Sequence, residues 1–156
     1  MAWFSTVPVV LDALAAEFKS ALSTAGGFDG VVVFDGPTVT EGAPTEAVTV
    51  GYHDDEVTSV DGEDTREGLS TQRSRERYTV NCAAAVLTGS GDIRAARARA
   101  YDILNVLGSA LAVNPTLGQS AMSVQPGSMT LTQTQDTDGA VAVVMFGVDV
   151  DAFTRL

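Results

Sequence analysis

The apolar spacing between residues 93 and 111 constrains the fold more than any other feature of the sequence. Apolar side chains recur there at three- and four-residue intervals, which places them on one face of an α-helix. Asp92 precedes the stripe and suits the N-cap, while Asn114 must end the helix because it stands before Pro115. A helix with one apolar face has to bury that face against another element. The stripe consists of Ile93, Ala96, Ala100, Ile103, Leu104, Leu107 and Leu111.

The segment before this helix has the two-residue period of a β-strand. Residues 77–87 predict a long central strand, because side chains at alternate positions lie on the same face of a sheet. Gly89-Ser90-Gly91 supplies the turn into the helix. One face of the strand carries Tyr78, Val80, Cys82, Ala84 and Val86, and the other carries Thr79, Asn81, Ala83, Ala85 and Leu87.

The first half of the chain predicts one helix and two short strands. Pro8 suits the first turn of a helix over residues 7–23, with Thr6 as its cap. Gly26-Gly27 ends this helix, and the strands are predicted at 31–34 and 47–52. Residues 38–46 and 53–75 read as loops by composition.

The C-terminal part predicts a β-hairpin. Its strands span residues 122–134, with a break near Pro126 and Gly127, and residues 141–150. Asp138 and Gly139 are typical of the turn between two such strands. Thr130, Thr132 and Thr134 share one face of the first strand.

These elements predict a single domain over residues 1–156 of the α+β class. Consecutive strands favour a mainly antiparallel sheet of about five strands, with two helices packed on one face. The other face, which carries the three threonines or their neighbours, would be solvated or would meet another subunit.

The charge balance excludes several functions. Twenty Asp and Glu stand against nine Lys and Arg, which gives a net charge of −11. Such a surface repels nucleic acid and anionic membranes, so we expect no specific DNA binding and no membrane partner, although it would suit a wall past which DNA slides. A single cysteine, Cys82, excludes an internal disulfide. The start lacks the basic region of a signal peptide, so the cytoplasm is the expected compartment.

No motif indicates an enzyme, a cofactor or a metal. His53, the only histidine, precedes Asp54, Asp55 and Glu56, but no nucleophile elbow accompanies it. Together with Asp61, Glu63 and Asp64, these carboxylates could gather around a hard cation. Their spacing does not match an EF-hand, and a solvated, charged loop is the preferred interpretation.

Charge is unevenly distributed along the chain. Between Glu41 and Thr65 every charged residue is acidic, and a basic group follows at once. Such a separation of charge can arise by chance on a solvated surface. It also suits a head-to-tail ring, in which one flank of each subunit has the opposite charge to the flank of the next subunit that it contacts. Within the basic group we select Arg73, Arg75 and Arg77 as candidate subunit or partner contacts. The group consists of Arg66, Arg73, Arg75, Arg77, Arg94, Arg97 and Arg99.

The order of the elements resembles a known family. An N-terminal helix, two strands, a long charged segment and the strand Glu76 to Cys82 precede the helix Ile93 to Ala112. The passage Asn114-Pro115-Thr116-Leu117-Gly118, a strand near Val124 and a hairpin ending at Val143 to Val150 follow. Over nearly the full chain this order resembles the tail terminator proteins of long-tailed (siphovirus-like) bacteriophages.

The resemblance implies a hexameric ring that caps the completed tail tube and provides the head-tail joining surface. It implies a virion protein assembled in the host cytoplasm, with further copies of itself, a tail tube protein and a head-tail connector protein as partners. DNA would pass through the lumen without specific binding, beside an acidic loop at the edge or lumen of the ring that contains Asp54, Asp55, Glu56, Asp61, Glu63 and Asp64.

Three other interpretations remain open at this stage. The first is another neck or head-completion protein of the same particle. The second is a small module in which residues 54–64 bind a metal or a protein. The third is a small enzyme that uses His53, which is disfavoured because too few polar groups converge with that residue.

Overall fold

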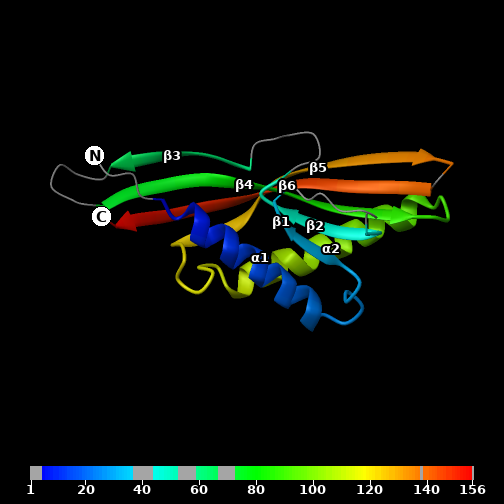
Figure 1. The fold of residues 1–156 in the computed structure, drawn as a ribbon, viewed down its shortest axis with the longest axis horizontal. Coiled ribbons are helices and arrows are strands. Elements are labelled where there is room, and N and C mark those ends of the chain that lie inside the picture. Colours follow the sequence, from blue (N-terminus) through cyan, green and yellow to red (C-terminus); the bar gives the residue numbers. More distant parts are fainter. Residues whose placement is uncertain (1–4, 37–43, 53–58, 67–72, 138, 156) are drawn as a thin grey trace.

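Both helices lie on one side of a single sheet in the computed structural model, which describes residues 5–36, 44–52, 59–66, 73–137 and 139–155 (Figure 1). This arrangement confirms the predicted α+β class, the mainly antiparallel sheet and the helices on one face. The elements are α1 (Val7–Thr24), β1 (Val32–Asp35), β2 (Glu46–Val50), β3 (Val60–Arg66), β4 (Arg73–Thr88), α2 (Ile93–Val113), β5 (Ser123–Asp136) and β6 (Gly139–Arg155).

The sheet has six strands in the order β1-β2-β4-β6-β5, with β3 paired to β4 beyond the end of β2. One expectation is corrected here: the predicted loop over 53–75 contains β3 and the start of β4. Within the mainly antiparallel sheet, β1 pairs with β2 in parallel. The other pairs are antiparallel. β6 is longer than predicted because its second half pairs with the early part of β4.

Helix α2 forms as its apolar stripe predicts. The Asp92 carboxylate accepts a hydrogen bond from the backbone N–H of Ala95 at 3.1 Å, which caps the first turn. The stripe faces the sheet, where burial of apolar surface stabilises the packing. Its fully buried members are Ala96, Ala100, Ile103, Leu107 and Leu111.

Helix α1 begins where predicted, but the cap is different. Thr6 holds the N-cap position without a side-chain cap hydrogen bond, so the predicted role of its hydroxyl is wrong. The carboxylate of Glu76, on β4, instead accepts hydrogen bonds from the Thr6 backbone N–H at 2.6 Å and the Ser5 hydroxyl at 2.7 Å. The Thr6 hydroxyl bonds to the phenol of Tyr78 at 3.0 Å. Burial raises the pKa of Tyr78 to about 12.

The passage after α2 is a compact turn that starts β5. The Asn114 side chain accepts a hydrogen bond from the Gly118 backbone N–H at 3.0 Å, and the Pro115 carbonyl accepts one from Val124 at 2.7 Å. Leu117 is 4% exposed and has a positive φ of 46°. The turn therefore anchors a core side chain while it directs the chain into the sheet.

The core lies between the helices and one face of the sheet. The alternation predicted for β4 is confirmed, since its even-numbered positions from Tyr78 to Val86 are buried. Phe18 of α1 packs against Phe146 of β6 with 6.4 Å between ring centroids. The two described helices are not hydrophobic enough over the required length to cross a membrane.

Candidate assembly surface on the open sheet face

Both described helices lie on the other side of the sheet, and we call the side turned away from them the open face (Figure 1). Side chains alternate between faces along a strand, so the pairing register identifies those that point outward. Residues that pair with one another across five neighbouring strands form a row, and the side chains of one such row are exposed or half-buried. By contrast, Ala84 and Val144, each next in sequence to a member of this row, are fully buried. The row consists of Val32, Ala47, Ala85, Val143 and Thr132.

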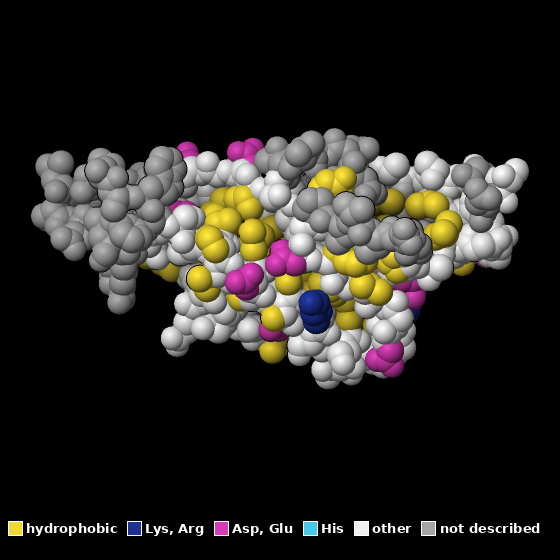
Figure 2. Space-filling model, viewed as in Figure 1, with side chains coloured by type: hydrophobic (Ala, Val, Ile, Leu, Met, Phe, Trp, Pro, Cys, Tyr) yellow, Lys and Arg dark blue, Asp and Glu magenta, His cyan; other side chains and the backbone are white. Residues whose placement is uncertain are grey.

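The part of the open face near the β5–β6 turn is apolar. Val32 is 39% exposed and Leu87 is 37% exposed, and the side chains between them are half-buried. We call this part of the open face the apolar half, and it consists of Val32, Phe34, Ala47, Ala85, Leu87, Val141, Val143 and Met145. Figure 2 views the molecule with α1 in front, and hydrophobic side chains are exposed there in several groups with basic and acidic side chains among them.

Three threonines border the apolar half on β5. Thr130, Thr132 and Thr134 are exposed and pair in register with Met145, Val143 and Val141. This placement confirms that the threonines lie on the face opposite the helices. Their hydroxyl groups add polarity without charge.

The other end of the open face is an open hollow of about 680 Å³, which we call the polar half. Two strand alternations produce it: Arg75 and Arg77 point outward from β4, and Asp149 and Asp151 from the adjacent β6. Sequence reasoning missed these two aspartates. Their spacing within the sequence Val148-Asp149-Val150-Asp151 could have identified them, because it places both carboxylates on one face of a strand. The side chains that line the hollow include those of Asp61, Glu63, Arg77, Thr79, Asp149 and Asp151.

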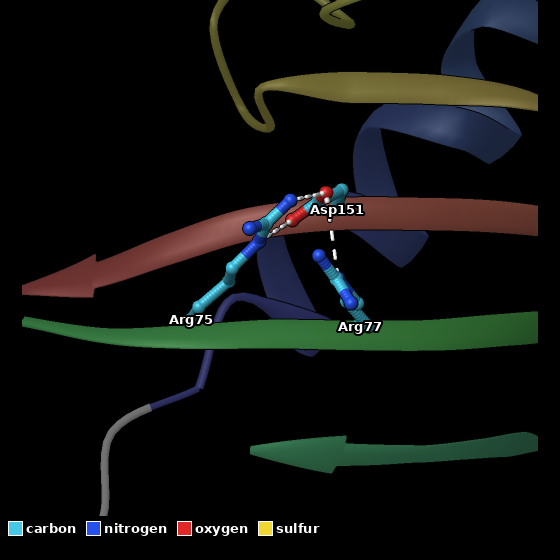
Figure 3. Close-up of polar contacts among 3 residues, drawn as sticks. All are labelled: Arg75, Arg77 and Asp151. Atoms are coloured by element: carbon cyan, nitrogen blue, oxygen red, sulfur yellow. Dashed lines mark hydrogen bonds and ion pairs between the residues drawn. The ribbon is translucent and has the colours of Figure 1, made fainter. Parts of the chain in front are cut away.

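Arg75 binds its neighbour in the same chain. Its guanidinium donates two hydrogen bonds to the Asp151 carboxylate, with Nε–Oδ1 at 3.0 Å and Nη2–Oδ2 at 2.6 Å (Figure 3). These bonds lower the pKa of Asp151, against the opposing effect of burial. Arg77 is 3.7 Å from the same carboxylate and keeps 57% of its side chain exposed. Of this pair, Arg77 therefore has more surface to offer a partner.

The polar half contains a second internal contact. Thr79 donates a hydrogen bond from its hydroxyl to the Asp149 carboxylate at 2.8 Å. Asp61 and Glu63 lie opposite Thr79 and Arg77 in the β3–β4 register. Both aspartates of β6 therefore bind side chains of β4 within the same chain.

The predicted acidic loop is corrected in part. Asp61, Glu63 and Asp64 belong to strand β3, and Asp61 and Glu63 are exposed there. His53, Asp54, Asp55 and Glu56 lie outside the described residues. Arg73 is the first residue of β4. Among the described parts of the chain, no group of three or more His, Cys, Asp or Glu could hold a metal ion.

The charge segregation along the sequence does not persist in the fold. Pairing of β3 with β4 places acidic Glu63 opposite basic Arg77. Arg99 of α2 forms an ion pair with Glu46 of β2, and it stacks over the Phe28 ring at 4.3 Å. Acidic and basic segments that are separate in sequence are therefore neighbours in space, so segregated flanks do not support a ring interface.

Cys82 is a core side chain, as predicted. It is fully buried, and burial raises its pKa to about 12. A thiol this far above neutral pH is protonated and unreactive. It therefore takes no part in the open face.

Comparison with known proteins finds distant structural similarity and no match to a known family. No protein-family model matches the chain, and no curated protein matches its sequence. Among solved structures, a chain in the virion of a native gene transfer agent particle is similar over 92% of this chain and 98% of that chain, with 9% sequence identity and a TM-score of 0.44.

Proposed function

We propose that this chain is a structural protein of a virion, a tail terminator that caps the completed tail tube as a hexameric ring and presents the head-tail joining surface. The observation that carries the proposal is the combination of an open sheet face with β1 and β5, whose outer edges are unpaired within the described part of the chain. A sheet with two free edges presents unpaired backbone groups that other chains can bind. The element order in the sequence resembles that of tail terminators, and this resemblance supports the proposed role of the assembly.

The open face suits the inner wall of a ring. Its central row consists of small side chains, from Val32 and Ala47 to Val143, while the bulky helices cover the opposite face. When a sheet curves, side chains on the concave side crowd together, so small residues belong there and helices belong outside. Curvature toward the open face also removes part of the apolar half from water.

The polar half supports passage of DNA along that wall. Asp61, Glu63, Asp149 and Asp151 surround the hollow, and Asp151 neutralises much of the charge of Arg75. Carboxylates repel phosphate groups, and arginines that are already paired attract them less. A bore with this lining would let DNA move without adhering.

Termination follows from the asymmetry of such a ring. A head-to-tail ring has two different faces, because every subunit points the same way around the axis. One face would match the last ring of tube subunits, and the other would offer no site for a further tube subunit and bind the connector instead. On this account the protein acts by docking, and we propose no catalytic role for it.

Electron microscopy of tubes assembled from purified tail tube protein of the same particle tests the proposal. Added before assembly, this protein should stop growth and appear as a ring at one end of each tube. Tubes that elongate to the same length without end-bound rings would contradict a terminator. Binding to connector rings but not to tubes would identify a neck or head-completion protein instead.

A further inference from the structure

The three edge strands of the sheet differ in how well they are protected against pairing with other chains. Natural proteins protect edges with charge, proline, bulges or short strands. β3 carries several charged residues, and β1 is four residues long. β5 contains Pro126 and a bulge before Met129, but residues 128–135 have no charge, proline or glycine. This eight-residue stretch is the least protected edge in the described part of the sheet.

The free edge of β1 lies level with this stretch. Following the register across the sheet, Val32 lies in the same row as Thr132, and Phe34 lies in the same row as Thr130. Val32 is 39% exposed, and Phe34 is half-buried. The two edges also have opposite directions, because β5 runs parallel to β4, and β4 runs antiparallel to β2 and β1.

The level and direction of the two edges would allow the β5 edge of one copy to pair with the β1 edge of the next. A rotation about an axis parallel to the strands keeps strand directions unchanged and brings the β5 edge of one copy to the β1 edge of another. The two edges then meet as an antiparallel pair, the arrangement that gives the more stable ladder. Because the contact joins different edges, it repeats from copy to copy, and it closes into a ring when the rotation between neighbours divides a full turn.

We propose that residues 128–135 of β5 bind strand β1 of a neighbouring copy by antiparallel pairing, so that the sheets of successive subunits form one continuous wall. The inference rests on the proposed ring and names the contact that closes it. Cross-strand neighbours at the joint would be Thr132 with Val32 and Thr130 with Phe34. These are pairs of β-branched and aromatic residues, which stabilise adjacent strands.

The shortness of β1 limits the strength of a single joint. Four residues supply few backbone hydrogen bonds, so one pair of subunits would dissociate readily. In a closed ring each subunit makes two joints, and the last joint forms at the high effective concentration of an intramolecular contact. Assembly should therefore be cooperative, with few free dimers.

Cysteine cross-linking tests the pairing. The double variant Val32→Cys/Thr132→Cys, treated with a short bismaleimide, should give a ladder of covalent oligomers on a denaturing gel. The wild type should stay unlinked because Cys82 is fully buried. The double variant Val32→Cys/Gln125→Cys is the matched control, since Gln125 is exposed on β5 but lies before the bulge, outside the stretch. It should give little product.

Two other patterns would overturn the pairing. Efficient linking of Thr132→Cys alone would mean that two β5 edges meet, as in a two-fold dimer. Absence of a ladder in the first double variant would exclude the β5–β1 contact, even if the protein still forms rings and caps tubes, in which case the proposed function stands. A ladder from a protein that never binds tube ends supports the pairing and contradicts the function.

A charge placed in the edge gives an independent test. Thr132→Lys should abolish the ring mass seen by light scattering, because pairing would press a lysine against Val32 of the next copy. Gln125→Lys adds the same charge to the same strand and should leave the mass unchanged. An unchanged mass for Thr132→Lys would overturn the pairing. Thermal unfolding of both variants checks that the monomer remains folded.

Discussion

The two halves of the open face differ in how many of their side chains and strand edges have partners within the same chain. In the polar half, Asp151 binds Arg75 and Asp149 binds Thr79. In the apolar half, Val32 and Leu87 remain more than a third exposed, and the neighbouring β1 and β5 edges are unpaired in the described sheet. The comparison suggests that one half stabilises the subunit and the other joins it to its neighbours.

A charge in the centre of the apolar half should have the largest effect, because it acts on assembly itself. Val143→Asp places a carboxylate between Ala85 and Thr132. In the proposed ring, each subunit would then direct one such carboxylate into a narrow bore. We expect complete loss of the assembled mass in light scattering, while the folded monomer loses about 1 kcal/mol from the partly buried valine.

The matched control places the same charge in the polar half. Gln125 is exposed beside the hollow, so Gln125→Asp should keep the assembled mass and change stability by no more than about 0.5 kcal/mol. Equal loss of assembly in the two variants would show that the halves do not differ.

The next effect concerns the stability of the subunit. Glu76 is 6% exposed and joins β4 to the start of α1 through Ser5 and Thr6. Glu76→Ala should lower the free energy of unfolding by about 2 kcal/mol, because the helix N–H group loses its buried acceptor. Urea denaturation measures the change. The exposed Glu63→Ala is the control and should have almost no effect, and a similar loss in both variants would argue against the cap.

Two arginines of the polar half should differ in a smaller way. Arg75 donates two hydrogen bonds to Asp151, whereas Arg77 lies 3.7 Å from it and is 57% exposed. We expect a loss of about 1 kcal/mol for Arg75→Ala, and only a few tenths for Arg77→Ala, since exposed ion pairs contribute little. If the Arg77 variant were the less stable of the two, the assignment of Arg75 as the structural partner would be wrong.

The smallest effect is a pH dependence. The folded state lowers the pKa of Asp151, so its contribution to stability is fully present above the unfolded pKa of about 3.9 and is lost as pH falls through the folded value. Urea midpoints of the wild type should therefore fall more steeply below about pH 4 than those of Asp151→Asn. Parallel acid profiles would mean that the Arg75 pairing contributes nothing measurable to this range.

Sequence patterns predicted those elements that short-range periodicity determines. The stripe of α2 and the alternation of β4 each repeat over many residues, so their faces could be assigned before any contact was known. The shared face of the β5 threonines followed for the same reason, whereas the break near Pro126 was predicted from the proline and Gly127 themselves. The open face was thus predictable from the alternation on the strands.

Strand β3 was not predictable in this way. Asp61, Gly62, Glu63 and Asp64 disfavour strands, and they form one here because β4 offers a partner edge. Pairing depends on two segments together and leaves no mark in the residue pattern of either one, which also explains why the parallel pairing of β1 with β2 was missed. The pairing of β3 with β4 also brought acidic and basic segments together. The separation of charge along the sequence therefore did not correspond to an acidic flank and a basic flank of the folded subunit.

The solution mass of the wild-type protein, measured by light scattering at several protein and salt concentrations, tests the central claim most directly. The account predicts a mass near six times the 16.2 kDa of one chain, reached cooperatively as concentration rises. A mass of a single chain under every condition, including in the presence of tail tubes, would contradict an assembly role for the open face and its edges.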